Sequence, residues 1–177
     1  ISDIPTVFKQ VNEKLSKMEV TDGATIVLAT VTPTLVSVAH LGDARAIVVK
    51  SDGSSYPLTF DHKPTERSEL DVLKEARAFV ASGRLSSHLA VSRALGDFLI
   101  DGVSRMPDLT TYNIKENDSW LVLACDGVFD VLENNEIAKI ISQVDDVNEA
   151  ACLIRNTAYS KGSQDNISAI VVDIVLK

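Results

Sequence analysis

The sequence predicts a layered α+β fold in which antiparallel strands pack against helices. Segments rich in β-branched residues follow one another through short turns, and helical periodicity appears mainly before and after this block. The regular strand-helix alternation of a parallel sheet is missing. Consecutive strands joined by tight turns must pair antiparallel. Several strands are apolar on both faces, which favours stacked sheets beneath helices.

The N-terminal half is expected to hold a helix, four strands and a second helix. Apolar residues recur at helical spacing over Val7–Met18, after Asp3 as a candidate cap. Asp52-Gly53 is a strong hairpin turn between the last two strands. A second helix is expected over Thr65–Ser82, with Gly83 at its C-terminal cap. The four strands are expected at Thr25–Thr32, Leu35–His40, Arg45–Lys50 and Tyr56–Phe60.

The C-terminal half is expected to begin and end with a strand. Trp120–Ala124 is a continuous apolar run typical of a buried strand, and Ile167–Leu176 has the strongest strand pattern in the sequence. Helices are expected between them at Asn135–Gln143 and Val147–Tyr159. No repeat or Ser/Gly-rich linker divides the chain, so residues 1–177 are expected to form a single domain.

Composition excludes several classes of partner. The 17 basic and 25 acidic residues give a net charge of −8, and no dense Lys/Arg cluster suggests a nucleic-acid partner. Apolar runs stay well below the roughly 18 residues of a membrane span, so no membrane partner is expected. Cys125 and Cys152 are too few for a disulfide framework, which favours reduced thiols in a cytoplasmic or nuclear compartment.

Two aspartates fall at the ends of predicted strands. Asp126 closely follows the Trp120–Ala124 run, and Asp165 precedes the last strand. If these strands are antiparallel neighbours, both carboxylates reach the same sheet edge. Two carboxylates about 4 Å apart repel by roughly 4 kcal/mol at an effective dielectric constant near 20. A proton or a divalent cation must compensate for this repulsion.

The available ligand types favour a hard cation. Carboxylate oxygens select Mg²⁺, Mn²⁺ or Ca²⁺. The sequence contains no EF-hand loop, so calcium is less favoured than the other two ions. No Cys or His pair has zinc spacing, since His40, His62 and His88 are scattered in the sequence. Asp43, at a turn between strands, is a third candidate. From spacing alone, an ordinary turn role is the simpler explanation of each aspartate.

Other polar residues have structural explanations. Ser92, Arg93 and Asp97 form a compact polar set in an apolar frame, which predicts a buried Arg–Asp pair that fixes a loop. His62 is expected to be a surface or capping residue ahead of the second helix. Glu69 is expected to be an ordinary charge that complements the helix dipole.

Five motifs, in this order, resemble those of the metal-dependent protein phosphatases of type 2C, the PPM family. They are Gly42–Ala46 (Gly-Asp-Ala-Arg-Ala), Asp61–Pro64 (Asp-His-Lys-Pro), Leu89–Asp97, Leu123–Asp130 and Gly162–Ile167. Each motif is weak alone, but five in the right order form a highly specific signal that covers nearly the whole chain.

The resemblance implies an αββα arrangement of four layers, in which an antiparallel β-sandwich is flanked by helices. It also implies removal of phosphate from phosphoserine and phosphothreonine, so that the partner is a phosphoprotein. In that family two Mg²⁺ or Mn²⁺ ions share a bridging water, which attacks phosphorus in line.

The resemblance also carries roles to individual residues. Asp126 and Asp165 are similar to ligands of the metal pair, and Asp43, together with Asp126, resembles the ligands of a weaker third metal. Asp130 resembles a residue that holds metal-bound water. Three further residues of the same motifs are expected to support the ligands: Asn166, Asp97 and Gly127.

Several motifs of the family are not found in these 177 residues. They are the Glu-Asp pair, the Asp-Gly-His-Gly segment with the proposed proton donor, and the phosphate-binding Arg, so no catalytic residue is identified here. Thr21–Thr25 resembles the region that follows them, and the chain starts at Ile1 rather than Met. We therefore expect the C-terminal portion of a catalytic domain that lacks its N-terminal part. Such a chain should be inactive or weak, and its exposed sheet edges favour self-association.

The alternative function is a pseudophosphatase scaffold that binds proteins without catalysis, although a degenerate domain should also lose Asp126 or Asp165. The gene sequence ahead of Ile1 would discriminate between the two.

The sequence also departs from the family at Ser82-Gly83, where family members usually have Gly-Gly, in a stretch that usually carries a flap beside the active site.

Overall fold

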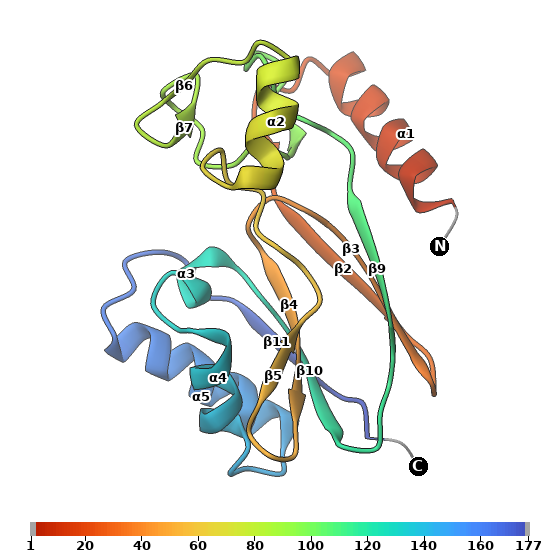
Figure 1. Ribbon diagram of the computed structural model, residues 1–177, viewed down its shortest axis with the longest axis vertical. Coiled ribbons are helices and arrows are strands. Elements are labelled where there is room, and N and C mark those ends of the chain that lie inside the picture. Colours follow the sequence, from red (N-terminus) through yellow and green to blue (C-terminus); the bar gives the residue numbers. More distant parts are fainter. Residues whose placement is uncertain (1–2, 176–177) are drawn as a thin grey trace. The chain divides into compact units, whose positions relative to one another are not determined.

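The structure is a computed structural model that describes residues 3–175 (Figure 1). The helices are α1 Ile4–Lys17, α2 Arg67–Glu75, α3 Asp126–Phe129, α4 Asn134–Ile141 and α5 Val147–Ser160. The longer strands are β2 Ile26–Val31, β3 Leu35–Leu41, β4 Arg45–Lys50, β5 Ser55–Pro57, β9 Asp108–Asn113, β10 Asp118–Ala124 and β11 Ala169–Asp173. Four strands have two residues each: β1 Gly23–Ala24, β6 Val80–Ala81, β7 Arg84–Leu85 and β8 Leu95–Gly96.

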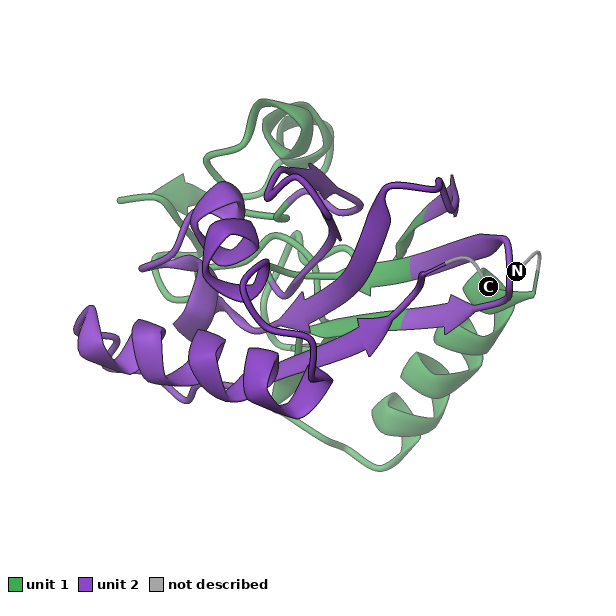
Figure 2. Cartoon of the chain, turned by 90° about the horizontal axis from the view of Figure 1, so that it is seen from below, with its two compact units in different colours: residues 1–28, 39–43, 61–109 green, residues 29–38, 44–60, 110–177 purple. Residues whose placement is uncertain are grey.

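The chain divides into two compact units, coloured separately in Figure 2. Unit 1 comprises residues 1–28, 39–43 and 61–109, and unit 2 comprises residues 29–38, 44–60 and 110–177. The sheets have the strand orders β11-β10-β4-β5, β2-β3-β9, β1-β8 and β6-β7. The prediction of an α+β fold with antiparallel sheets is confirmed, whereas a single domain over residues 1–177 stays a prediction.

Unit 2 is built on the antiparallel sheet β11-β10-β4-β5. Trp120, Val122 and Ala124 alternate along β10 and pack in one apolar cluster with buried residues of α3, α4 and α5. The intervening Leu121 and Leu123 are buried as well. The central strand is therefore covered on both faces, which explains its unbroken apolar run.

Helix α5 has an N-terminal cap and an apolar face, which together explain why this segment is helical. Asp146 accepts hydrogen bonds from the backbone N–H groups of Asn148 and Glu149, each at 2.9 Å, and so caps the helix. Its buried residues recur at helical spacing and face the sheet cluster: Ala150, Ile154 and Ala158.

Unit 1 holds two smaller apolar clusters. Phe8 of α1 packs with Ala39 and Leu41 of β3, and Leu73 of α2 packs with Leu85 and other buried residues of the segments that follow. These clusters position the loops of residues 61–66 and 86–107, which carry much of the polar network described below.

The helix predicted over Thr65–Ser82 is shorter in the structure. Helix α2 ends at Glu75, Arg77 has a φ of +53°, and β6 and β7 form a hairpin. Ser82 and Gly83 connect these strands with φ angles of +52° and +74°. Two successive positive φ angles are typical of a type I′ hairpin turn, so Gly83 serves a strand turn rather than a helix cap.

Other boundaries also differ from the sequence prediction. Strand β9 was not predicted, because its polar residues lack an apolar run and alternate weakly in burial. Strand β5 ends at Pro57 instead of Phe60. Strand β11 begins at Ala169 rather than Ile167, and the predicted end of that strand at Leu176 lies outside the described residues.

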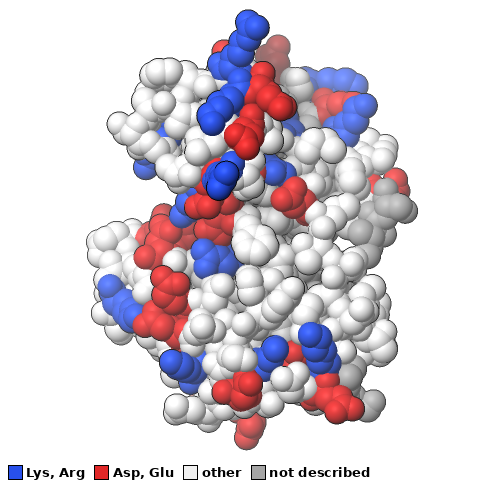
Figure 3. Space-filling view, viewed as in Figure 1, with Lys and Arg blue, Asp and Glu red and all other residues white. Residues whose placement is uncertain are grey.

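The face drawn in Figure 3 carries charged side chains of both signs, and basic and acidic side chains lie among one another there. Within residues 3–175, none of the helices combines the length and apolar character needed to cross a bilayer.

Candidate metal centre

The end of β10 and the start of β11 lie side by side in unit 2. The strands pair antiparallel, with Ala124 opposite Ala169. Asp126 begins α3 shortly after β10, and Asp165 lies in the loop ahead of β11. The two strands are thus antiparallel neighbours, the condition stated for the sequence, and both aspartate-bearing segments lie at one sheet edge.

Hydrogen bonds lock the two segments together. Cys125 N donates to Ser168 O at 3.2 Å, Ser168 N donates to Cys125 Sγ at 3.2 Å, and the Cys125 thiol donates to Asn166 O at 3.0 Å. The buried Ser163 Oγ donates to Gly127 O at 2.6 Å. Sequence reasoning missed Ser163, because a serine in a polar loop gives no sign of a distant backbone partner.

Gly127 lies in direct contact with the loop ahead of β11. A Cβ atom at this position would lie 2.2 Å from Asn166 O and 3.3 Å from Asp165 Cβ. Only glycine therefore permits the present approach of these segments. We refer to residues 125–127 and 163–168 as the aspartate junction.

Two carboxylates of the aspartate junction are held by neighbouring backbone groups. Gly127 N donates to Asp126 Oδ1 at 2.9 Å, and Asn166 N donates to Asp165 Oδ1 at 2.7 Å. A hollow of about 270 Å³ adjoins the junction, and Asp130 and Asp165 lie on its wall. The acidic groups present are carboxylates, and the thiol of Cys125 is engaged with the backbone. This donor set fits Mg²⁺ or Mn²⁺ rather than a soft metal.

Asp43 lies in unit 1, at the end of the segment Ala39–Asp43. Its side chain is buried, with 6% of the residue exposed, and Lys63 Nζ lies 3.9 Å from Asp43 Oδ2. The carboxylate follows β3 at a turn, as the sequence indicated. Its role beside Asp126 stays a prediction from the resemblance.

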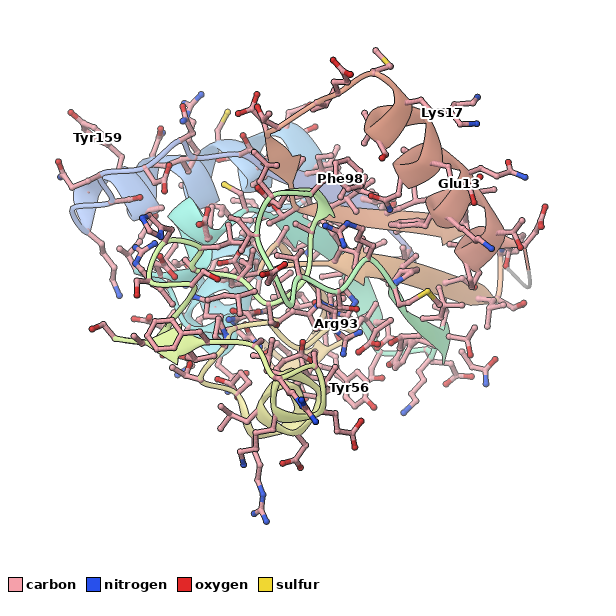
Figure 4. All side chains as sticks on the ribbon, turned by 90° about the horizontal axis from the view of Figure 1, so that it is seen from above. Glu13, Lys17, Tyr56, Arg93, Phe98 and Tyr159 are labelled. Atoms are coloured by element: carbon pink, nitrogen blue, oxygen red, sulfur yellow. The ribbon has the colours of Figure 1, made fainter. Side chains whose placement is uncertain are left out.

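The polar set around Arg93 differs from the predicted Arg–Asp97 pair. Arg93 donates to Glu69 from Nε at 2.9 Å and from Nη2 at 2.6 Å, and its Nη1 donates to Asp108 Oδ1 at 2.6 Å. Ser92 Oγ also donates to Glu69 at 2.6 Å. Glu69 lies in the first turn of α2, where a charge that complements the helix dipole was expected, but it is only 2% exposed and also anchors this network. Figure 4 labels Arg93 among the side chains.

Asp97 has a different environment. It has a φ of +47°, and its carboxylate lies against Gly23, where a Cβ atom would overlap it. Burial raises the pKa of Asp97, with the charge of Arg105 opposing the rise and that of Asp22 adding to it. The predicted support of metal ligands by Asp97 stays a prediction.

His62 is buried, so the prediction of a surface or capping residue is wrong. It is 2% exposed, its ring stacks on that of His40 with centroids 4.3 Å apart, and its Nε2 lies 3.2 Å from Asp108 Oδ2. Two histidines that are scattered in the sequence therefore meet in space. Burial lowers the pKa of His62, and the charges of His40 and Arg93 lower it further.

The carboxylates of this network stay ionised. Hydrogen bonds and the charge of Arg93 hold the pKa values of Glu69 and Asp108 below their usual range, although burial opposes the shift. The same two carboxylates raise the pKa of Arg93 against the effect of its burial. The result is a neutral His62 beside an ionised carboxylate-arginine chain.

His40, His62 and Asp108 form a cluster with ligand atoms within 4.8 Å of one another, which is a candidate metal group. The two rings are stacked with only 9° between their planes. Lone pairs of ring nitrogens lie in the ring planes, so two parallel stacked rings cannot both aim at one ion. His62 also accepts a hydrogen bond at Nδ1 from Gly42 N, which leaves its proton on Nε2 toward Asp108. This arrangement favours a hydrogen-bonded network over a metal site.

The network predicts loss of stability on mild acidification. The folded pKa of His62 is lowered, so below its usual value of 6.5 the unfolded chain binds the proton more readily than the folded chain. The stability contribution of neutral His62 is therefore complete well above pH 6.5 and decreases as the pH falls through 6.5 toward the folded pKa. We expect the free energy of unfolding from urea titrations to fall between about pH 7.5 and pH 5. A His62→Asn variant should show a flatter profile, and an equally steep profile in that variant would contradict this assignment.

Comparisons with known proteins agree with the motif order. A family model described as protein phosphatase 2C matches residues 4–167. Protein phosphatase 2C homolog 1 of Saccharomyces cerevisiae is 36% identical over 135 residues, which cover 76% of this chain and 48% of that protein. Protein phosphatase 1L of Bos taurus is 30% identical over 177 residues, which cover 96% of this chain and 49% of that protein.

A solved structure of a C. elegans sex determining protein has a similar fold. It superposes with a TM-score of 0.85 at 26% identity, covering 96% of this chain and 44% of the other. The chain thus spans about half the length of the curated relatives it matches. With a family match over residues 4–167, the chain belongs to the protein phosphatase 2C family.

Proposed function

We propose that this chain forms part of a domain that hydrolyses phosphoserine and phosphothreonine in proteins with the help of Mg²⁺ or Mn²⁺. The aspartate junction carries the proposal, because it holds the carboxylate-bearing segments of two separate family motifs against each other. Asp126 and Asp165 are the proposed ligands of a pair of cations, and Asp43 is the proposed ligand of a weaker third one.

The residues of the junction and of the adjoining hollow have distinct proposed tasks. The N–H groups of Gly127 and Asn166 orient the carboxylates of Asp126 and Asp165 by direct hydrogen bonds. Asp130, on the wall of the adjoining hollow, orients a water molecule. Bound divalent cations supply activation of water and neutralisation of charge on the phosphoryl group.

The 177 residues are expected to turn over substrate weakly or not at all. They contain no Asp-Gly-His-Gly segment and no Glu-Asp pair, which the resemblance associates with further ligands and the proton donor. An assay of phosphate release from a phosphoserine peptide with Mn²⁺ tests this expectation. Turnover as fast as that of ordinary family members would contradict it.

Metal binding tests the proposed ligands directly. We expect a protein with both Asp126→Asn and Asp165→Asn to lose Mn²⁺ binding in calorimetric titrations, because both carboxylates of the junction are neutralised. A double variant with Asp71→Asn and Asp101→Asn removes the same formal charge from exposed positions and should bind Mn²⁺ like the unmodified chain. Unchanged affinity in the first variant would refute the ligand assignment and favour the scaffold alternative.

We also propose that the chain self-associates through the open edge of β11. This strand ends its sheet and presents Ile170 with 62% of its surface exposed. An apolar edge strand is a template for pairing with a second copy. Sedimentation should show association that rises with concentration and weakens in an Ile170→Lys variant. A monomer at high concentration would count against this proposal.

A further inference from the structure

His62 holds both peptide groups that flank Gly42. The backbone N–H of His62 donates to Gly42 O at 3.0 Å, and Gly42 N donates to His62 Nδ1 at 3.1 Å. Gly42 O belongs to the peptide that continues into Asp43. His62, twenty positions after Gly42, therefore restrains the direction in which the chain enters Asp43.

The turn at Gly42 has little freedom to adjust. Gly42 has a φ of +94°, and a Cβ atom there would lie 2.3 Å from Thr25 Cγ2. The next side chain, that of Asp43, is buried in the same unit. Contact with Thr25 and the two hydrogen bonds with His62 therefore restrain the turn together.

The His62 ring is itself held in one orientation and one tautomer. Because Gly42 N is a donor, Nδ1 must be the unprotonated acceptor, and the proton lies on Nε2, 3.2 Å from Asp108 Oδ2. Arg93 bonds to the other oxygen of Asp108 at 2.6 Å. The stacked ring of His40 limits rotation from one face, and the backbone O of His62 accepts from Ser92 N at 2.8 Å.

We infer that His62 is a positioning residue for Asp43: its imidazole fixes Gly42, and through it the carboxylate of Asp43, for cation binding. This rests on the proposed ligand role of Asp43. His62 does not touch the cation; it sets the geometry of a ligand through a backbone hydrogen bond. Groups that orient metal ligands typically change metal affinity by about 10- to 100-fold when they are removed.

Two isosteric variants separate the two hydrogen bonds of the ring. His62→Asn keeps an acceptor at the position of Nδ1, and so preserves the bond from Gly42 N. His62→Gln keeps a donor at the position of Nε2 toward Asp108 but has no acceptor for Gly42 N. The readout is Mn²⁺ titration of the ¹⁵N-labelled chain, followed by paramagnetic broadening of the Ala44 amide signal next to Asp43.

We expect the Mn²⁺ concentration for half-broadening to stay near its original value in His62→Asn and to rise at least about tenfold in His62→Gln. The imidazole ¹⁵N spectrum of the unmodified chain should show the proton on Nε2. Dispersed amide spectra of both variants exclude unfolding as the cause of any difference.

Two results would overturn the inference in distinguishable ways. If Asp43→Asn leaves the broadening unchanged, Asp43 is not a ligand, and its proposed role fails together with that of His62. If Asp43→Asn removes the broadening but His62→Gln titrates like His62→Asn, the ligand role stands and only the positioning role of His62 fails.

Discussion

Replacement of Arg93 by methionine is expected to lower the free energy of unfolding by about 3–5 kcal/mol. The guanidinium makes two hydrogen bonds to Glu69, whose carboxylate is 2% exposed, and a third to Asp108. Methionine preserves much of the apolar stem but removes all of these donors. A buried negative charge at Glu69 then lacks its cation, and uncompensated buried charge is among the most destabilising of single changes. Chemical denaturation followed by circular dichroism measures the loss.

A second substitution separates buried charge from lost packing. In the Arg93→Met background, Glu69→Gln should restore part of the stability, because a neutral amide can remain bonded to Ser92 Oγ without an isolated charge. Lys74→Met is the matched control, since Lys74 is an exposed residue of the same helix as Glu69 that meets Asp71 at 3.6 Å. It should change the free energy of unfolding by no more than about 0.5 kcal/mol. Equal losses in Arg93→Met and in the double variant would refute the charge explanation.

This network also shows where sequence reasoning reaches its limit. Glu69 falls in the first turn of a helix, which is where acidic residues are ordinary, and Arg93 lies 24 residues further on. Asp97 is nearer to Arg93 in sequence, and local spacing therefore favours it as the partner. Spacing in the sequence cannot show whether Arg93 pairs with the nearby Asp97 or with the distant Glu69, because the path of the loops decides which carboxylate it meets.

The local sequence pattern was sufficient to predict the bounds of elements that have a helical repeat or a continuous apolar run. Strand β4 matches its predicted bounds, and α5 and β10 match within one or two residues, because α5 buries residues at helical spacing and the two strands are continuous apolar runs. The meeting of the Asp126 and Asp165 segments was expected on the condition that the two strands are antiparallel neighbours, and β10 and β11 do pair in this way. Strand β9 and the β6-β7 hairpin were missed because one is mostly polar and the other depends on positive φ angles at Ser82 and Gly83.

Gly127→Ala is expected to disrupt the aspartate junction. The new Cβ atom would lie 2.2 Å from Asn166 O, a backbone atom that cannot rotate away as a flexible side chain can. The two segments must separate, which strains the bonds from Ser163 Oγ to Gly127 O and from the Cys125 thiol to Asn166 O. We expect a stability loss of about 1–3 kcal/mol from overpacking. Mn²⁺ affinity should fall by at least about tenfold, because the carboxylates of Asp126 and Asp165 no longer keep their spacing.

Gly162→Ala is the control that isolates this close approach. Gly162 lies at the start of the same loop with a φ of +89°, and a Cβ atom there meets nothing within 4 Å. That variant should lose about 1 kcal/mol from the left-handed backbone conformation alone and yet bind Mn²⁺ like the unmodified chain. Gly162→Ala should therefore lower stability alone, whereas Gly127→Ala should lower both stability and Mn²⁺ affinity. If Gly127→Ala retained full Mn²⁺ affinity despite its loss of stability, the contact between α3 and the Asp165 loop would not be what sets the ligand geometry.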